Sequence, residues 1–338
     1  MASFVKIYYP YLDLLKFLCC IGIISIHINP FSKCELANYY FSHLANIYIA
    51  IFFVVSSCLF WWKIRWNNSD YNVLWKFTYR LLILLFVWGG ILAWHWGILY
   101  YHEYQEHGGT NFLLSLLLRL TTSGTCLGAW FIVSLIYTTW ILYFLNRYLN
   151  KHMVFILVTT IWLYHSMVYY ENMNDCLNIF WRGEYYQGKG IHSAFLPPRA
   201  IFWIESGFYL IPYLQKLITS RRNIIITVCI IALCFLGPFL KHYYFVTNAV
   251  ISILTPMLLL KVCSTKSHPK LVTLRNMSII VYFVHRPICT AFEFLNKHGY
   301  IAEKNGWLLF LTTVILSCLT AYIIVETSKN LKILKYCY

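Results

Sequence analysis

Charge is scarce in this chain, and acidic charge is the scarcest. Only 12% of the 338 residues are charged, with 12 Asp and Glu against 27 Lys and Arg. Soluble domains carry about 25% charged residues, so this composition excludes an ordinary soluble domain. Hydrophobic residues make up 60% of the chain, which indicates a protein whose helices cross a membrane several times.

Other absences narrow the class further. No C-x-x-C pair occurs among the 12 cysteines, which excludes the usual zinc and thioredoxin-like sites. Most cysteines lie in apolar runs and are expected to be small buried side chains, although one disulfide among Cys34, Cys126 and Cys176 remains open. No internal repeat is evident, which disfavours a transporter built from repeated halves. The first apolar run has no A-x-A-like cleavage site, so we expect it to be retained as a helix.

Apolar segments long enough to cross a membrane recur along the whole chain. Ten are predicted, at about 8–29, 44–64, 79–100, 128–147, 152–171, 200–217, 223–240, 243–262, 276–296 and 306–327. The fold class is therefore all-α, a polytopic membrane helical bundle of about ten transmembrane helices, forming a single domain over residues 1–338. With the N-terminus inside, 17 basic residues fall in cytoplasmic segments and 8 in outer ones, which predicts that both termini are cytoplasmic.

The predicted outer loops lie at about 30–43, 101–127 and 171–199. The last contains "WRGEYYQGKGIHSAFLPPR", and aromatic side chains together with carboxylates suit a sugar ligand. An aromatic belt at the membrane interface would give the same composition, so both interpretations stay open. The apolar stretch 111–121 is too short to span and is expected to be an interfacial or re-entrant helix.

The first predicted span carries ionisable residues in a segment that is otherwise apolar, "DLLKFLCCIGIISIH". Lys16 and His27 are 11 residues apart, close to three helical turns, so they share one face about 16 Å apart along the axis. Asp13 precedes Lys16 by three residues and can neighbour it. Ionisable groups inside lipid are costly, which makes them functional candidates.

Two interpretations of this stripe are possible. In the structural one, Lys16 snorkels to the interface, Asp13 neutralises it, and His27 lies at the outer end of the helix. In the functional one, Lys16 attracts an anion from the cytoplasm and His27 is a general base near the outer face, since its pKa lies near neutrality.

The segment "YPYLDLLKFLCCIGIISIHI" resembles the first helix of acyltransferase family 3 membrane proteins, which carry a Y-x-D-x-L-R-x10-H pattern. Lys16 stands here where the family usually has Arg, which keeps the charge and loses the bidentate geometry. Further similar segments follow in the family's order over nearly the whole chain. They are "IFFVVSSCLFW" (51–61), "LWKFTYRLL" (74–82), "AWFIVSLIYTTWIL" (129–142), "IFWIESGFYL" (201–210) and "SIIVYFVHRPI" (278–288).

The resemblance implies transfer of an acyl group, most simply acetyl, from cytoplasmic acyl-CoA to a hydroxyl of a surface or lipid-linked glycan at the outer face. Acetyl-CoA is then a co-substrate, with no tightly bound cofactor and no metal. The implied catalytic residues are His27 as general base, Asp13 and His285. Lys16, Lys76 and Arg80 would bind the donor, because CoA carries phosphates.

Five more residues are implied as substrate-binding. Ser56, Trp130 and Tyr282 are candidates for stabilising the oxyanion, although helix packing is the simpler role for each of them. Arg286 lies in the ninth predicted span beside His285, where two polar neighbours are hard to explain as lipid-facing. Glu205 could bind acceptor hydroxyls or orient His27, or could instead pair with Arg199.

The partners expected are acyl-CoA, the glycan acceptor and membrane lipid. Nucleic acid is not expected, since the basic residues are scattered between apolar runs. The predicted location is a bacterial inner or plasma membrane. A transporter or flippase for a lipid-linked glycan is the alternative function, because Asp13, Lys16, Glu205 and Arg286 could line a polar pathway through the bundle.

Overall fold

The computed structural model describes residues 8–66, 70–95, 97, 130–171, 198–211, 220–239, 244–260, 268–301 and 305–338. The described part is 89% helical and has no β-strands. The longer helices are α1 (Pro10–His27), α3 (Asn46–Trp66), α4 (Asp70–Ile91), α7 (Trp130–Tyr148), α8 (Lys151–Glu171), α15 (Pro269–Lys297) and α16 (Trp307–Thr327). The shorter ones are α2 (Glu35–Leu44), α11 (Pro198–Glu205), α13 (Ser220–Leu236), α14 (Tyr244–Leu260), the π-helix η3 (Ser206–Leu210) and the 3₁₀ helices η4 (Gly237–Phe239) and η6 (Lys332–Cys337).

The prediction of an all-helical fold is confirmed, and each of the ten predicted spans overlaps a described helix. Five segments are long and apolar enough to cross a membrane by length and composition. They are Pro10–His27, Glu35–Ile64, Tyr71–Ile91, Pro269–Lys297 and Trp307–Thr327. The count of ten spans and the cytoplasmic termini remain predictions.

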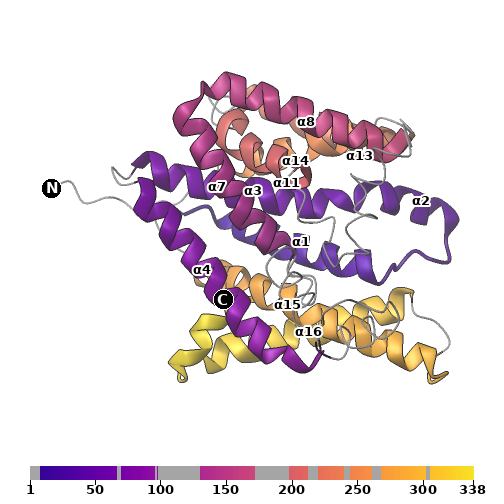
Figure 1. Cartoon of the computed structure of the whole chain (residues 1–338). Helices are drawn as coiled ribbons and strands as arrows, with labels where there is room; N and C mark the ends of the chain where they lie inside the picture. Colours follow the sequence, from indigo (N-terminus) through magenta and orange to yellow (C-terminus); the bar gives the residue numbers. More distant parts are fainter. Residues whose placement is uncertain are drawn as a thin grey trace, which may run out of the picture. The chain divides into compact units, whose positions relative to one another are not determined.

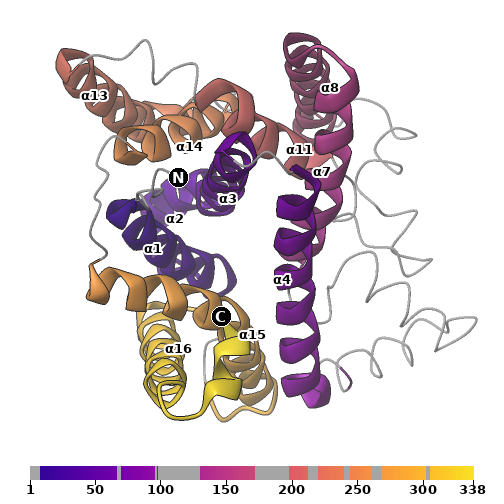
Figure 2. The ribbon, with the colours of Figure 1, turned by 90° about the vertical axis from the view of Figure 1, so that its left-hand side faces the viewer.

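The chain forms two compact units. The first comprises Met1–Val55 with Leu214–Tyr338, and the second Ser56–Tyr213. In the first unit α15 packs against both α1 and α16 (Figures 1 and 2). In the same unit α14 packs against α1 and α13. In the second unit α11 packs against α7 and α8, and α4 packs against α7. The single domain over 1–338 stays a prediction.

One predicted loop has a helix of its own. The connection expected at 30–43 contains α2, whose Tyr40 ring meets Phe239 edge-on at 5.7 Å between centroids. This packing explains the helix, because its aromatic side chains find a partner within the same unit. The loops expected at 101–127 and 171–199 and the short helix expected at 111–121 lie almost wholly outside the described residues. Cys34 is a free thiol.

A proline stands at the beginning of both α1 and α15. Pro10 and Pro269 stand in the first turn of α1 and α15, where a missing N–H costs nothing and the fixed φ suits a helix. With 29 residues, α15 is about 43 Å long and exceeds the hydrocarbon thickness of about 30 Å. Pro287 lies inside it and cannot donate the usual helical hydrogen bond beside Arg286.

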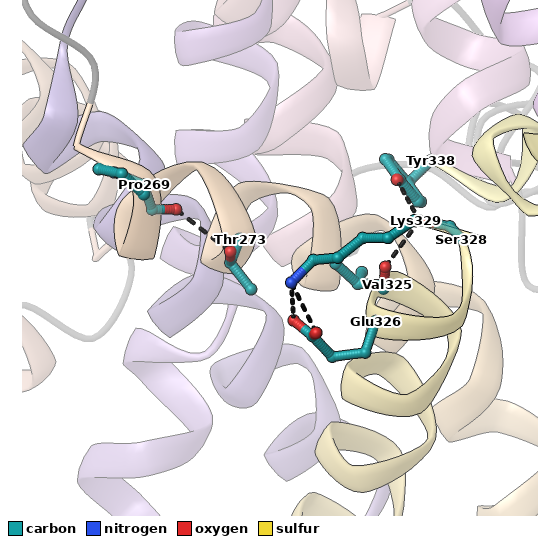
Figure 3. A network of polar contacts seen from close by, with 7 residues as sticks. All are labelled: Pro269, Thr273, Val325, Glu326, Ser328, Lys329 and Tyr338. Atoms are coloured by element: carbon teal, nitrogen blue, oxygen red, sulfur yellow. Dashed lines mark hydrogen bonds and ion pairs between the residues drawn. The ribbon is translucent and has the colours of Figure 1, made fainter.

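The chain end folds back onto the end of α16, as Figure 3 shows. Ser328 Oγ donates to Val325 O at 2.6 Å and lies 2.7 Å from the Tyr338 hydroxyl, while Cys337 is buried. Lys329 Nζ donates to both carboxylate oxygens of Glu326, at 2.8 and 2.6 Å. These hydrogen bonds with Glu326 raise the pKa of Lys329.

Gly22 sets how closely α1 packs within the first unit. A Cβ placed there would lie 2.5 Å from the ring of Tyr48, which is closer than non-bonded carbon atoms approach each other. The aromatic ring of Tyr48 therefore occupies the space that a side chain at this position would need.

We expect Gly22→Ala to destabilise the protein by about 1–3 kcal/mol, because the added methyl group overpacks the contact with Tyr48. Thermal unfolding in detergent, followed by circular dichroism, measures the shift. Gly90→Ala in α4 is the matched control, since among the described residues no atom outside its own helix backbone lies within 4 Å of the added Cβ. Equal melting temperatures for the two variants would contradict the packing argument.

Candidate functional site

Three contacts join α1 to α15 at successive levels. An ion pair links Arg275 Nη1 to Asp13 Oδ2 at 3.8 Å. The Cys20 thiol donates to the backbone carbonyl of Ser278 at 3.0 Å, and an Arg286 nitrogen lies 3.0 Å from His27 Nδ1. The residue numbers rise together in both helices, so α1 and α15 run parallel. On α1 the three positions are spaced by seven residues, which keeps them on one face.

His27 ends α1 and is exposed there. The contact with Arg286 fixes the tautomer of the neutral ring, because a guanidinium only donates hydrogen bonds. Nδ1 must therefore be the acceptor, and the proton of the neutral imidazole is on Nε2. In this arrangement the lone pair of His27 is occupied by Arg286, so proton uptake at Nδ1 requires the guanidinium to move.

His285 lies beside His27, with 5.2 Å between ring centroids and 31° between ring planes. Its side chain is buried, and its Nδ1 lies 3.1 Å from the Val281 carbonyl, which can only accept. Nδ1 therefore carries the proton, and Nε2 has the lone pair. Nε2 is buried without a hydrogen-bond partner in the described structure, so an unsatisfied basic nitrogen is held next to His27.

A pocket of about 250 Å³ opens beside His27. Its lining is the end of α1 with the two residues that follow it, two residues near the end of α15, and a residue two positions before the start of α16. The residues are Ile26, His27, Ile28, Asn29, Cys289, Glu293 and Asn305. Imidazole, carboxylate and carboxamide groups dominate this lining, so the pocket suits a small polar ligand.

Asn29 holds the pocket wall in shape. Its backbone N–H donates to Asn305 Oδ1 at 3.2 Å, and its carbonyl accepts from Gly306 N–H at 2.9 Å. Its side-chain oxygen accepts from Phe31 N–H at 2.8 Å, and its Nδ2 donates to Asn38 of α2. One residue thus ties the end of α1 to α2 and to the start of α16, which fixes where His27 projects.

The other predicted residues of the first unit lie along the same two helices. Tyr282 is one turn before His285, with 6.1 Å between their ring centroids. Lys16 is half-buried on α1, one turn from Asp13. The structure thus brings His27, His285 and Arg286 together, whereas Asp13 and Lys16 lie toward the other end of α1.

Glu205 is fully buried in the second unit. Its Oε2 accepts from Asn146 Nδ2 at 2.9 Å, and its Oε1 has no hydrogen-bond partner among the described residues. The helix continues after Glu205 as the π-helix η3, and Ile211 N–H donates to Ser206 O five residues back. Such π-segments occur frequently at functional sites. The side chain of Arg199, its expected partner, lies outside the described part.

The remaining predicted residues also belong to the second unit. Lys76 and Arg80 are exposed, one turn apart on α4. Between them Thr78 is buried and its hydroxyl accepts from Trp140 Nε1 at 2.9 Å, which fixes α4 against α7. Ser56 is half-buried in α3, and Trp130 begins α7.

Two charged residues of the site were not expected from the sequence. From the sequence, Arg275 is predicted only to be one of the basic residues of the cytoplasmic segments. No role is predicted for Glu293, which lies near the end of the ninth predicted span. The sequence holds a weak signal for both residues. Arg275 lies three residues before Ser278, and Glu293 lies eight residues after His285. Those spacings place charge on the helix that carries the S-x-x-x-Y-x-x-H pattern.

A family model described as an acyltransferase domain matches residues 9–326. No curated protein and no solved structure matches the chain.

We expect Asp13 and Arg275 to be energetically coupled, because removal of Arg275 leaves the buried carboxylate of Asp13 without its ion pair. A double-mutant cycle with Asp13→Asn and Arg275→Gln should give about 1 kcal/mol of coupling in thermal unfolding. The Lys329–Glu326 pair is the control, since it is exposed and should give less. Additive effects at Asp13 and Arg275 would contradict the ion pair.

Proposed function

The chain belongs to acyltransferase family 3, and from this membership we propose that it is a membrane O-acyltransferase that takes an acyl group, acetyl in the simplest case, from cytoplasmic acyl-CoA to a hydroxyl of a surface or lipid-linked glycan. Family membership supports a membrane acyltransferase. The identities of the acyl donor, the acceptor and the general base are what we propose. The observation that supports it is His27, which faces a polar pocket and contacts Arg286 and His285.

In the proposed reaction the acceptor hydroxyl attacks the carbonyl carbon of the thioester. His27 Nδ1 takes the hydroxyl proton as the new C–O bond forms. The tetrahedral intermediate then breaks its C–S bond, and the imidazolium returns the proton to the CoA thiolate. The products are the acyl ester and free CoA, so atoms and charge balance without a cofactor or a metal.

Arg286 has a role in the proposed reaction, because its contact occupies the lone pair of His27 Nδ1. We propose that the guanidinium leaves His27 Nδ1 when a thioester arrives and donates to the developing oxyanion instead. That exchange frees the lone pair at the moment when negative charge needs a donor. His285 remains alongside, and its unpartnered Nε2 can accept a hydrogen bond from the ring of His27 after a small rotation.

In the second unit, Lys76 and Arg80 are the proposed contacts to the phosphates of the donor. In the first unit, Lys16 stays a proposed donor-binding residue. Asp13 then balances the charge of Lys16 and Arg275 at that end of α1. Ser56, Trp130 and Tyr282 stay proposals for the oxyanion or the donor, and Glu205 for the acceptor.

We expect His27→Ala to lower acyl transfer by at least about 100-fold, because general base catalysis typically contributes 10²–10⁴-fold. Mass spectrometry of surface glycans from cells that carry or lack the gene measures the product and also identifies the acyl group. His298→Ala is the matched control, because this histidine is exposed at the end of α15. Unchanged acylation by a folded His27→Ala variant would refute the proposed role.

We expect the double variant Lys76→Ala and Arg80→Ala to bind radiolabelled acetyl-CoA about 10-fold or more weakly, since two charge-assisted contacts to phosphate are lost. Equilibrium binding to purified protein in nanodiscs gives the dissociation constant. Lys270→Ala, an exposed lysine in the first turn of α15, should bind as the wild type does. No saturable binding, together with CoA-independent movement of glycan across vesicles, would favour the flippase alternative.

A further inference from the structure

We propose that the pocket beside His27 is the acceptor subsite, in which Glu293 receives hydrogen bonds from hydroxyl groups that neighbour the one to be acylated. The ligand class is a neutral polyol, a single sugar ring with adjacent hydroxyls. This inference rests on the proposed function, since it assigns the substrate of that same site.

Glu293 is a carboxylate without a hydrogen-bond or ion-pair partner among the described residues. It lines the pocket and is exposed. No described residue gives it a hydrogen bond or an ion pair, and Lys297, one turn further along α15, does not pair with it. A carboxylate has two oxygens that accept together, which matches the two donors of a vicinal diol.

The charges around the pocket favour a neutral ligand over a cationic one. Arg286 contacts His27 at the pocket wall, so a positive charge already stands near one end. An amine in the pocket would gain attraction from Glu293 and meet repulsion from Arg286. A neutral polyol avoids the repulsion and satisfies the carboxylate, and it meets the carboxamides of Asn29 and Asn305 as further polar neighbours.

The spacing along α15 limits the size of the ligand. Arg286 and Glu293 are seven residues apart, two turns and about 10 Å on one helix face. Both side chains shorten this gap, and the pocket volume of about 250 Å³ is below the usual range of about 300–1,000 Å³ for ligand pockets. One sugar ring fits these dimensions, with its reacting hydroxyl at His27 and the neighbouring hydroxyls at Glu293.

The test uses purified full-length protein in nanodiscs, [¹⁴C]acetyl-CoA, and envelope membranes from source cells that lack the gene as acceptor. For Glu293→Ala we expect the apparent KM for acceptor to rise about 10-fold or more, as loss of a charge-assisted hydrogen bond predicts. The acceptor KM of Glu293→Gln should lie between those of the wild type and Glu293→Ala, because the amide keeps one accepting oxygen. The dissociation constant for acetyl-CoA and the melting temperature should stay at wild-type values.

Glu326→Ala is the matched control, since this glutamate lies at the end of α16 and pairs with Lys329. It should leave the acceptor KM unchanged. An acceptor KM within twofold of wild type for Glu293→Ala would overturn the subsite. A parallel loss of acetyl-CoA binding and thermal stability would also overturn it, by showing a structural role. No labelling by the wild type, with acetyl-CoA bound or not, would instead overturn the proposed function itself.

Discussion

Polar and ionised side chains inside hydrocarbon are costly unless they find partners, and α1 meets this constraint by facing α15 with its polar residues. Asp13, Cys20 and His27 each contact a group of α15, at 3.8, 3.0 and 3.0 Å. Because the helices run parallel, one packing register satisfies all three together. A shift by one residue along either helix would break both the contact of Asp13 with Arg275 and that of His27 with Arg286.

The same register fixes the chemistry that His27 can perform. A guanidinium at Nδ1 makes the imidazole a donor at rest, and a base only after Arg286 moves. The arrangement differs from a triad, in which a carboxylate holds the other nitrogen and leaves a lone pair ready. In the proposed reaction, coupling proton uptake to arrival of the thioester would keep His27 inactive toward water when no donor is present.

Asn29 and Gly22 connect this site to the rest of the first unit. Asn29 binds groups of α2 and of the segment before α16, so the pocket depends on chain regions far apart in sequence. Gly22 lets α1 approach Tyr48, which sets the position of the helix that ends at His27. Stability and site geometry therefore rest on the same close contacts, and substitutions in α1 are expected to affect both.

The sequence by itself determined the helical class, because runs of apolar residues need no tertiary context to be recognised. It also determined the one-faced stripe of Asp13, Lys16 and His27, since helical period alone places them. Only the tertiary structure decided that Arg275 pairs with Asp13, that Arg286 occupies His27 Nδ1, and that Glu293 lines the pocket. These contacts join residues more than 250 positions apart, and helix packing, which local patterns do not encode, brings them together.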